Sequence, residues 1–224
     1  MHPLSVAVIL ASLGMDEASI IAAILHDTVE DTAITHDEVK KEFGETIADL
    51  VDGVTKIGKG PLQTKEEQQA ENVRKMLMAM SEDIRVIIIK LADRLHNCRT
   101  IEYMPEHKRD KILSETMFIF IPLAHRLGLY SVKSEMEDRW LRYKEPEAFH
   151  DITAKINRNI IDKEKEINEF IAPIDVALTN AGFKYEIKKR VKTPYSIWNK
   201  MNTKGITFDQ IYDLYAVRII FDPD

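Results

Sequence analysis

The segment "DIRVIIIKLADRLHN", residues 83–97, most strongly limits the possible fold, because its apolar residues are almost continuous. A helix of this composition is buried on nearly every side, so other helices must surround it. Asp93 stands late in this segment, and a buried carboxylate is costly unless it is paired or bound to a cation. The segment therefore predicts a helical core and a polar site at Asp93.

The preceding residues also predict helices. Apolar residues run from 4 to 13, and Gly14 marks their end. Asp16 can cap the following helix, whose apolar residues recur at helical spacing. The motif "THDE", residues 35–38, is a capping box that opens a further helix, which Gly44 closes. These signals predict a succession of short helices before the buried one.

Beyond the buried segment, helices are expected at about 105–127 and 130–143, followed by a long charged helix over 146–182. The spacing of the apolar residues then changes from the helical period. The stretches "KYEIKKRV" and "YAVRIIF" read as strands, and they stand on either side of a helix that starts near Pro194. Residues 57–69, with two glycines and a proline, read as a loop.

We therefore expect a mainly α fold in three parts. Residues 1–145 form a helical domain, residues 146–182 a connecting helix, and residues 183–224 the start of an α/β unit. No internal repeat is visible in the sequence.

Composition limits the partners. The chain has 224 residues and a net charge of -6, which argues against general nucleic-acid binding, so a phosphorylated ligand would need a cation or a local basic cluster. Its one cysteine, Cys98, rules out an internal disulfide and fits a reducing cytoplasm. No apolar stretch approaches the roughly 20 residues that span a bilayer, so no membrane partner is expected.

The stretch "ILHDTVEDT" places a histidine and an aspartate side by side after an apolar run. Imidazole nitrogen and carboxylate oxygen together suit Mn, Fe or Zn. Adjacent residues on a helix point about 100° apart, so His26 and Asp27 can both reach one ion but cannot complete its shell. His2, at the start of the first helix, and Asp93 are the candidates to complete it.

Each of these residues also has a simpler interpretation. A histidine beside an aspartate is more often a hydrogen-bonded pair than a pair of metal ligands, and Asp93 could pair with Arg94 or with a lysine of a neighbouring helix. Glu30 and Asp31 could lie in a solvated turn. Spacing alone leaves both interpretations open.

Six motifs change this balance. They are "HP", "LHDTVEDT", "LVDGVTKI", "KLADRLHNCRT", "PLAHRLGLYSVKSEMED" and "IYDLYAVRII". In their order and spacing, which extend over essentially the whole chain, the sequence resembles the RelA/SpoT family of bacterial alarmone hydrolase-synthetases. The resemblance implies a cytoplasmic protein with an HD-type helical hydrolase domain, followed by a nucleotidyltransferase-like synthetase domain. It also implies Mn²⁺-dependent removal of the 3′-pyrophosphate from guanosine tetra- and pentaphosphate in the stringent response, giving GDP or GTP and pyrophosphate.

The resemblance also implies roles for single residues of the hydrolase part. The Mn²⁺ ligands would be His2, His26, Asp27 and Asp93. Glu30 and Asp31 match an acidic pair that positions or deprotonates the attacking water. Asn97, one helical turn after Asp93, would contact the nucleotide, as would Thr100 unless it only ends the helix; His96 could act in support of Asp93.

The stretch "KRVKTPYSIWNKM" resembles the ATP-binding entry of the synthetase, with Lys189 where the family has glycine and Thr193 where it has histidine. Asp213 matches a Mg²⁺-binding aspartate, and Arg218 is expected to follow it on the same strand. The matching residues of the proposed ATP and Mg²⁺ site are Arg190, Lys192, Ser196, Lys200, Asp213 and Arg218. The arginines and lysines of this set could also be ordinary surface residues that bind no ligand.

Both ends of the chain affect these expectations. In the family, a helix before the His-Pro motif carries an Arg-Lys pair that packs on guanine, so we expect weaker nucleotide binding here. The later acidic residue and the guanine-stacking tyrosine of the synthetase are absent, so we expect no synthesis. Contact with the ribosome is expected only through the C-terminal domains of relatives, and none with nucleic acid directly.

Two other functions stay open beside alarmone hydrolysis. The helical domain could bind alarmone and regulate without turnover. It could also be a different HD phosphohydrolase that acts on deoxynucleoside triphosphates or cyclic nucleotides.

Overall fold

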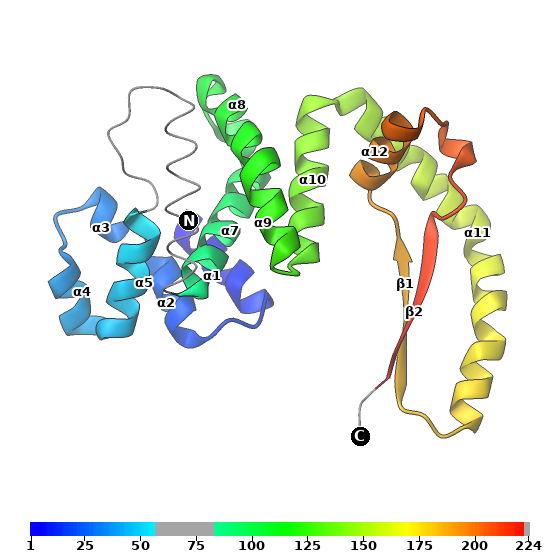
Figure 1. The fold of residues 1–224 in the computed structure, drawn as a ribbon, viewed down its shortest axis with the longest axis horizontal. Helices are drawn as coiled ribbons and strands as arrows, with labels where there is room; N and C mark the ends of the chain where they lie inside the picture. Colours follow the sequence, from blue (N-terminus) through cyan, green and yellow to red (C-terminus); the bar gives the residue numbers. More distant parts are fainter. Residues whose placement is uncertain (57–82, 222–224) are drawn as a thin grey trace. The chain divides into compact units, whose positions relative to one another are not determined.

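The computed structural model describes residues 1–56 and 83–221, apart from the side chains of Glu30, Asp31 and Lys56. The chain divides into two compact units, Met1–Met136 and Glu137–Asp224. Helices make up most of both units, and the described residues contain two strands (Figure 1). The predicted mainly α fold is therefore confirmed. The loop predicted at residues 57–69 lies outside the described residues.

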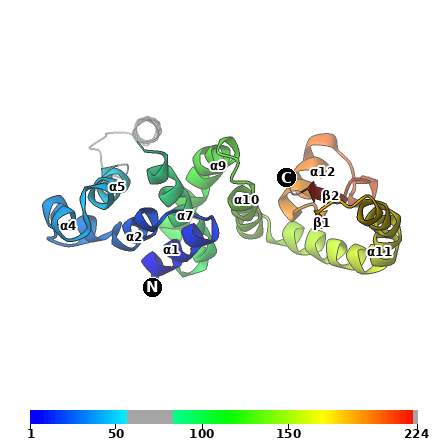
Figure 2. The ribbon, with the colours of Figure 1, turned by 90° about the horizontal axis from the view of Figure 1, so that it is seen from below.

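The first unit is built from helices that surround α7 (Ile84–Arg99), as the composition of that segment predicts. Helix α7 contacts α1, α2, α5 and α8 (Figure 2 shows α1 and α2 beside it). The described helices of this unit before α7 are α1 (His2–Ser12), α2 (Glu17–Leu25), α3 (Thr28–Asp31), α4 (His36–Phe43) and α5 (Glu45–Lys56). The residues of α7 that are buried in this core are Val86, Ile87, Ile89, Leu91, Ala92, Leu95 and Cys98.

Side-chain caps set the beginnings of several helices. The carboxylate of Asp16 accepts a hydrogen bond from the backbone of Ser19 and caps α2, which confirms the prediction. Asp83 caps α7, and Arg85 bonds both Asp83 and Asp16, with 2.7 Å between the guanidinium and each carboxylate. One guanidinium therefore ties together the first turns of α2 and α7.

The predicted capping box at the start of α4 is also confirmed. Thr35 accepts a hydrogen bond from the backbone of Glu38, and the Glu38 carboxylate accepts one from the backbone of Thr35. The helix ends before Gly44, whose φ of 89° favours glycine. Local sequence signals therefore fix both ends of α4.

Close packing of α5 on α7 depends on Gly53. A Cβ atom at Gly53 would lie 2.9 Å from Cγ2 of Val86, and the branched valine side chain has few other rotamers in a helix. The glycine of the motif "LVDGVTKI" therefore lets the backbone of α5 approach the buried helix.

We expect Gly53→Val to lower the free energy of unfolding by about 2 kcal/mol, because overpacking a core typically costs 1–3 kcal/mol. Urea denaturation followed by circular dichroism measures this. Thr46→Val places the same side chain on the exposed face of the same helix and serves as the control. Equal stability of the two variants would show that the contact with Val86 does not limit this packing.

The helical run expected over residues 105–127 is interrupted. It consists of α8 (Glu106–Glu115), a π-helical segment η2 (Thr116–Phe120) and α9 (Ile121–Arg126), and a short 3₁₀ helix, η1 (Ile101–Tyr103), precedes it. Pro122 stands in the first turn of α9 and has no backbone N–H, so regular α-helical hydrogen bonding cannot pass through it. The π segment accommodates this break.

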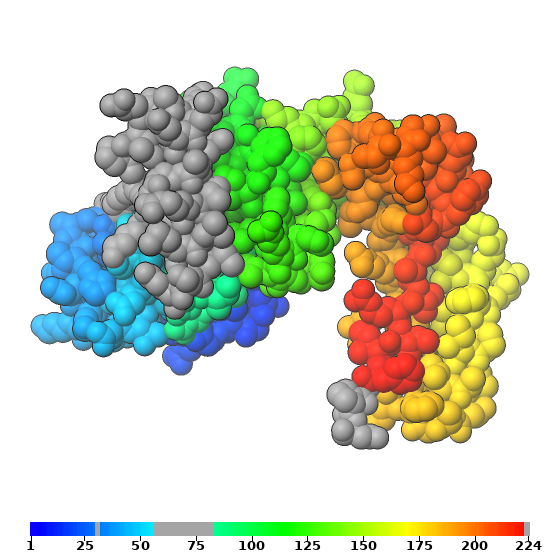
Figure 3. Space-filling model, viewed as in Figure 1, coloured from blue at the N-terminus to red at the C-terminus, as the bar shows by residue number. Residues whose placement is uncertain are grey.

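The second unit combines a long helix with two strands. The antiparallel strands β1 (Tyr185–Val191) and β2 (Tyr215–Phe221) pair from Tyr185 opposite Phe221 to Val191 opposite Tyr215. Helix α11 (Pro146–Asn180) runs beside them, as Figure 3 shows in yellow and red. The connection between the strands holds α12 (Pro194–Lys204) and η3 (Phe208–Gln210). The buried residues that join these elements are Ile152, Ile156, Ile197, Phe208, Ile211 and Leu214.

Helix α10 (Tyr130–Lys144) has residues in both units. Val132 and Met136 belong to the buried core of the first unit. Trp140 belongs to the second unit, where its ring lies 6.0 Å from Trp198 and 6.2 Å from Tyr195. The division by contacts thus falls within α10, and the sequence-based division at residue 145 stays a prediction.

Among the described residues, no helix is both long enough and apolar enough to cross a membrane.

Candidate metal centre

Two histidines and an aspartate from three separate helices meet in the first unit. His2 begins α1, His26 follows the last turn of α2, and Asp93 lies late in α7. One ligand atom from each lies within 4.8 Å of the others. His26 is buried, with 3% of its side chain exposed, whereas 30% of His2 and 18% of Asp93 is exposed. Three of the four predicted ligands therefore converge.

Asp93 is held as an anion at this point. Its Oδ1 lies 3.1 Å from Nε2 of His2 and accepts a hydrogen bond of 2.9 Å from the amide of Asn97. Burial raises the pKa of Asp93, but the hydrogen bond from His2 and the charge of Lys90 outweigh it and lower the pKa to about 2. The same hydrogen bond raises the pKa of His2.

The ring of His26 is held in one orientation by the backbone. Its Nδ1 lies 2.6 Å from the carbonyl oxygen of Ala23, and because a carbonyl only accepts, Nδ1 carries the hydrogen. In the neutral ring Nε2 then bears a lone pair, and it lies 3.0 Å from Oδ1 of Asp27. A lone pair facing a carboxylate oxygen is repulsive unless a positive charge lies there, so the donor set fits a bound cation.

Asp27 lies at the edge of this group. It precedes α3, 43% of its side chain is exposed, and its carboxylate contacts His26. Its carboxylate is not among the ligand atoms that lie within 4.8 Å of one another. The predicted acidic pair, Glu30 and Asp31, follows in α3, but the side chains of this pair lie outside the described residues.

Two further polar residues of α7 lie nearby. His96, expected to support Asp93, places its Nδ1 2.7 Å from Nδ1 of His2. Thr100 ends the helix, and its hydroxyl donates to the carbonyl oxygen of His96 at 3.0 Å. The sequence signal for the contact of His96 with His2 is weak, because 94 residues separate the two.

In the second unit, three residues of the proposed ATP and Mg²⁺ site converge. The ammonium groups of Lys192 and Lys200 both contact the carboxylate of Asp213, the latter at 2.6 Å. Hydrogen bonds from Lys192 and then Lys200 hold the pKa of Asp213 far below its usual range.

The expected placement of Asp213 and Arg218 on one strand is wrong. Arg218 lies in β2, but Asp213 precedes that strand. The strand pairing ends where Val191 of β1 stands opposite Tyr215, so Asp213 is not paired with a residue of β1. The register sets Arg190 of β1 opposite Ala216.

The two departures from the family motif have structural roles. Thr193 caps α12 by accepting from the backbone of Ser196, and the two hydroxyls lie 3.0 Å apart. Lys189 reaches across to α11 and donates to the amide oxygen of Asn168 at 2.6 Å. Both residues therefore make hydrogen bonds within the second unit.

The fold and this cluster define a class, a helical protein with a histidine–aspartate centre. The family model described as HD domain matches residues 1–130, and the one described as Region found in RelA / SpoT proteins matches residues 189–224. The chain belongs to the HD domain family, and within it to the RelA/SpoT type.

Curated relatives are similar over nearly the whole chain. A GTP pyrophosphokinase of Myxococcus xanthus is 48% identical over 222 residues, which is 98% of this chain and 29% of the relative. A guanosine-3′,5′-bis(diphosphate) 3′-pyrophosphohydrolase of Aquifex aeolicus is 48% identical over 220 residues, or 98% of this chain and 31% of the relative. The chain thus spans about a third of these relatives.

A solved structure, described as a metazoan ortholog of SpoT that hydrolyzes ppGpp, is 26% identical. Its TM-score is 0.49, and the match covers 64% of this chain and 80% of that one.

Proposed function

We propose that this chain removes the 3′-pyrophosphate of guanosine tetra- and pentaphosphate in a Mn²⁺-dependent reaction. The observation that carries the proposal is the meeting of His2, His26 and Asp93 from three helices. The similarity to the pyrophosphohydrolase of Aquifex aeolicus supports the choice of substrate. The same proposal places the protein in the cytoplasm.

The side chains of the cluster would hold and orient the cation. The Ala23 carbonyl fixes the hydrogen of His26 on Nδ1 and leaves Nε2 to bind, and Asn97 holds the carboxylate of Asp93 in place. Asp27 faces the same nitrogen of His26 and would complete the set. A bound Mn²⁺ would lower the pKa of water and offset phosphate charge.

Glu30 and Asp31 would take the proton of the attacking water, in line with their position in α3 directly after the cluster. The water oxygen bonds to the phosphorus next to the ribose, and the bond from that phosphorus to the 3′ oxygen breaks. The 3′ oxygen gains a proton, so the products are pyrophosphate and GDP or GTP. Asn97 and Thr100, next along α7, would contact the nucleotide.

The test is an assay of the metal-free chain with guanosine tetraphosphate, with and without added Mn²⁺. We expect release of pyrophosphate, and not of single phosphates, only when Mn²⁺ is present. Tight alarmone binding without product would instead identify a regulatory module. Turnover of deoxynucleoside triphosphates or cyclic nucleotides, with alarmone left intact, would identify another HD phosphohydrolase.

We also propose that the second unit carries part of an ATP and Mg²⁺ site. Positive side chains suit ATP phosphates, and Lys192 and Lys200 already converge on the carboxylate of Asp213. Ser196, in the first turn of α12, lies beside its cap Thr193. The strand residues proposed for the same site are Arg190 and Arg218.

A further inference from the structure

The ring of His2 is held by two polar contacts on opposite sides. Its Nε2 lies 3.1 Å from Oδ1 of Asp93, within the proposed metal centre. Its Nδ1 lies 2.7 Å from Nδ1 of His96, and the two rings meet edge to face with centroids 4.6 Å apart. His96 therefore touches the ring of His2 at the nitrogen that faces away from Asp93.

Two ring nitrogens at 2.7 Å need one hydrogen between them, because two lone pairs repel and two N–H groups collide. A neutral His2 can bind a cation through Nε2 only when its hydrogen is on Nδ1. That hydrogen must then point at Nδ1 of His96, which accepts it and carries its own hydrogen on Nε2.

We propose that His96 is a positioning residue for the metal centre, a role that rests on the function proposed above. When a cation binds Nε2 in place of the hydrogen that this nitrogen donates to Asp93, His96 accepts the hydrogen on Nδ1 of His2. His96 then fixes both the tautomer and the ring orientation that present Nε2. In the same way, the carbonyl oxygen of Ala23 accepts the hydrogen on Nδ1 of His26, at 2.6 Å. With the cation bound, both histidines of the cluster would therefore have Nδ1 bonded to an acceptor and Nε2 turned to the cation.

Position along the helix allows His96 to act in this way. It lies three residues after Asp93, so both side chains project from nearly the same face of α7. His2 comes from α1, which packs against α7. His96 thus links the first residue of α1 to the helix that carries the carboxylate.

A matched pair of variants separates positioning from packing. In His96→Asn the amide oxygen can take the place of Nδ1 as acceptor, whereas His96→Leu has a similar size and no acceptor. The affinity of the whole chain for Mn²⁺, measured by the loss of the free-ion electron paramagnetic resonance signal, is the readout. Circular dichroism and thermal melting without metal check the fold.

We expect His96→Leu to weaken Mn²⁺ binding by about 10- to 100-fold, the usual effect of removing a hydrogen-bonding neighbour of a ligand. His96→Asn should stay within about 3-fold of the wild type, by the same reasoning. Should His96→Leu fold poorly, His96→Gln replaces it, because its longer side chain carries the oxygen away from the Nδ1 position.

Wild-type affinity in His96→Leu, or equal weakening in His96→Asn, would overturn the positioning role and leave the proposed function intact. If the wild-type chain binds no Mn²⁺, or if Asp93→Asn binds it equally well, the proposed metal centre itself is wrong. The two failures are therefore distinguishable.

Discussion

Asp93→Asn is expected to lower both Mn²⁺ affinity and pyrophosphate release by at least about 100-fold. Loss of a residue that only hydrogen-bonds to a metal ligand typically lowers metal affinity or activity by about 10- to 100-fold, and this variant changes a proposed ligand itself. Asp93 is the carboxylate on which the contacts of His2 and Asn97 converge. An amide at this position keeps the size of the side chain but not the negative charge that favours a cation. Mn²⁺ titration and the alarmone assay measure the two effects.

The matched control is Asp49→Asn. Asp49 also pairs with a histidine, His36, at 3.2 Å, but both side chains lie on the exposed face of α4 and α5. We expect this variant to bind Mn²⁺ and release pyrophosphate as the wild type does. If Asp93→Asn retained the activity of the control, the assignment of Asp93 as a ligand would be wrong.

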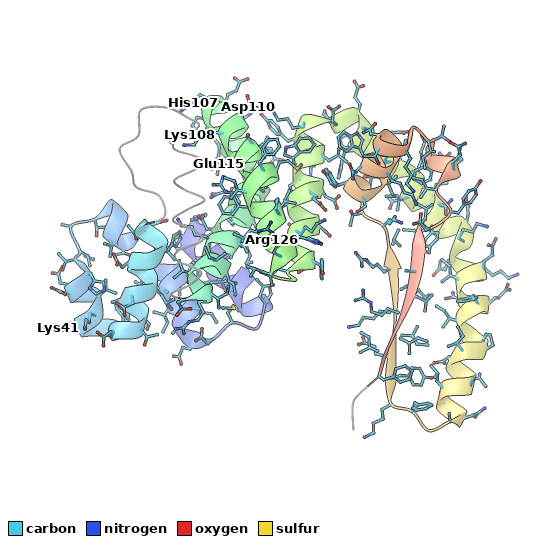
Figure 4. The ribbon with its side chains drawn as sticks, viewed as in Figure 1. Lys41, His107, Lys108, Asp110, Glu115 and Arg126 are labelled. Carbon is cyan, nitrogen blue, oxygen red and sulfur yellow. The ribbon has the colours of Figure 1, made fainter. Side chains whose placement is uncertain are left out.

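Glu115→Ala is expected to lower the free energy of unfolding by about 3 kcal/mol, because removing one partner of a buried ion pair leaves the other charge uncompensated. Glu115, labelled in Figure 4, lies at the end of α8 and contacts the guanidinium of Arg94 at 2.7 Å. Only 14% of Arg94 and 12% of Glu115 is exposed. The guanidinium also lies 4.3 Å from the ring centre of Phe120, which does not neutralise its charge.

Lys111→Met is the control for this pair. The ammonium of Lys111 lies 3.8 Å from Glu115, but 65% of the side chain is exposed. Exposed pairs contribute at most about 1 kcal/mol, so we expect almost no change in stability. Urea denaturation of both variants gives the comparison, and a loss below about 1 kcal/mol for Glu115→Ala would show that the Arg94 pair is worth no more than a surface pair.

The sequence predicted those parts of the fold that depend on local signals. The caps at Asp16 and Thr35 and the end of α4 at Gly44 follow from hydrogen bonds within a few residues. The buried character of α7 follows from its composition alone. The mainly α fold and the resemblance to the RelA/SpoT family are likewise confirmed.

Features that depend on distant contacts were not predictable in this way. Asp213 lies outside β2 because β1 ends at Val191, and only the pairing of the strands reveals this. Family motifs named His2, His26 and Asp93 together, but the contact of His2 with His96 depends on how α1 packs on α7.

The central claim is that His2, His26 and Asp93 share one divalent cation. Crystals of the chain grown with Mn²⁺, with diffraction recorded at the manganese absorption edge, test it most directly. We expect one anomalous peak between Nε2 of His26 and the carboxylate of Asp93, within bonding distance of His2. Ordered density for these three side chains with no peak among them, at saturating Mn²⁺, would contradict the account.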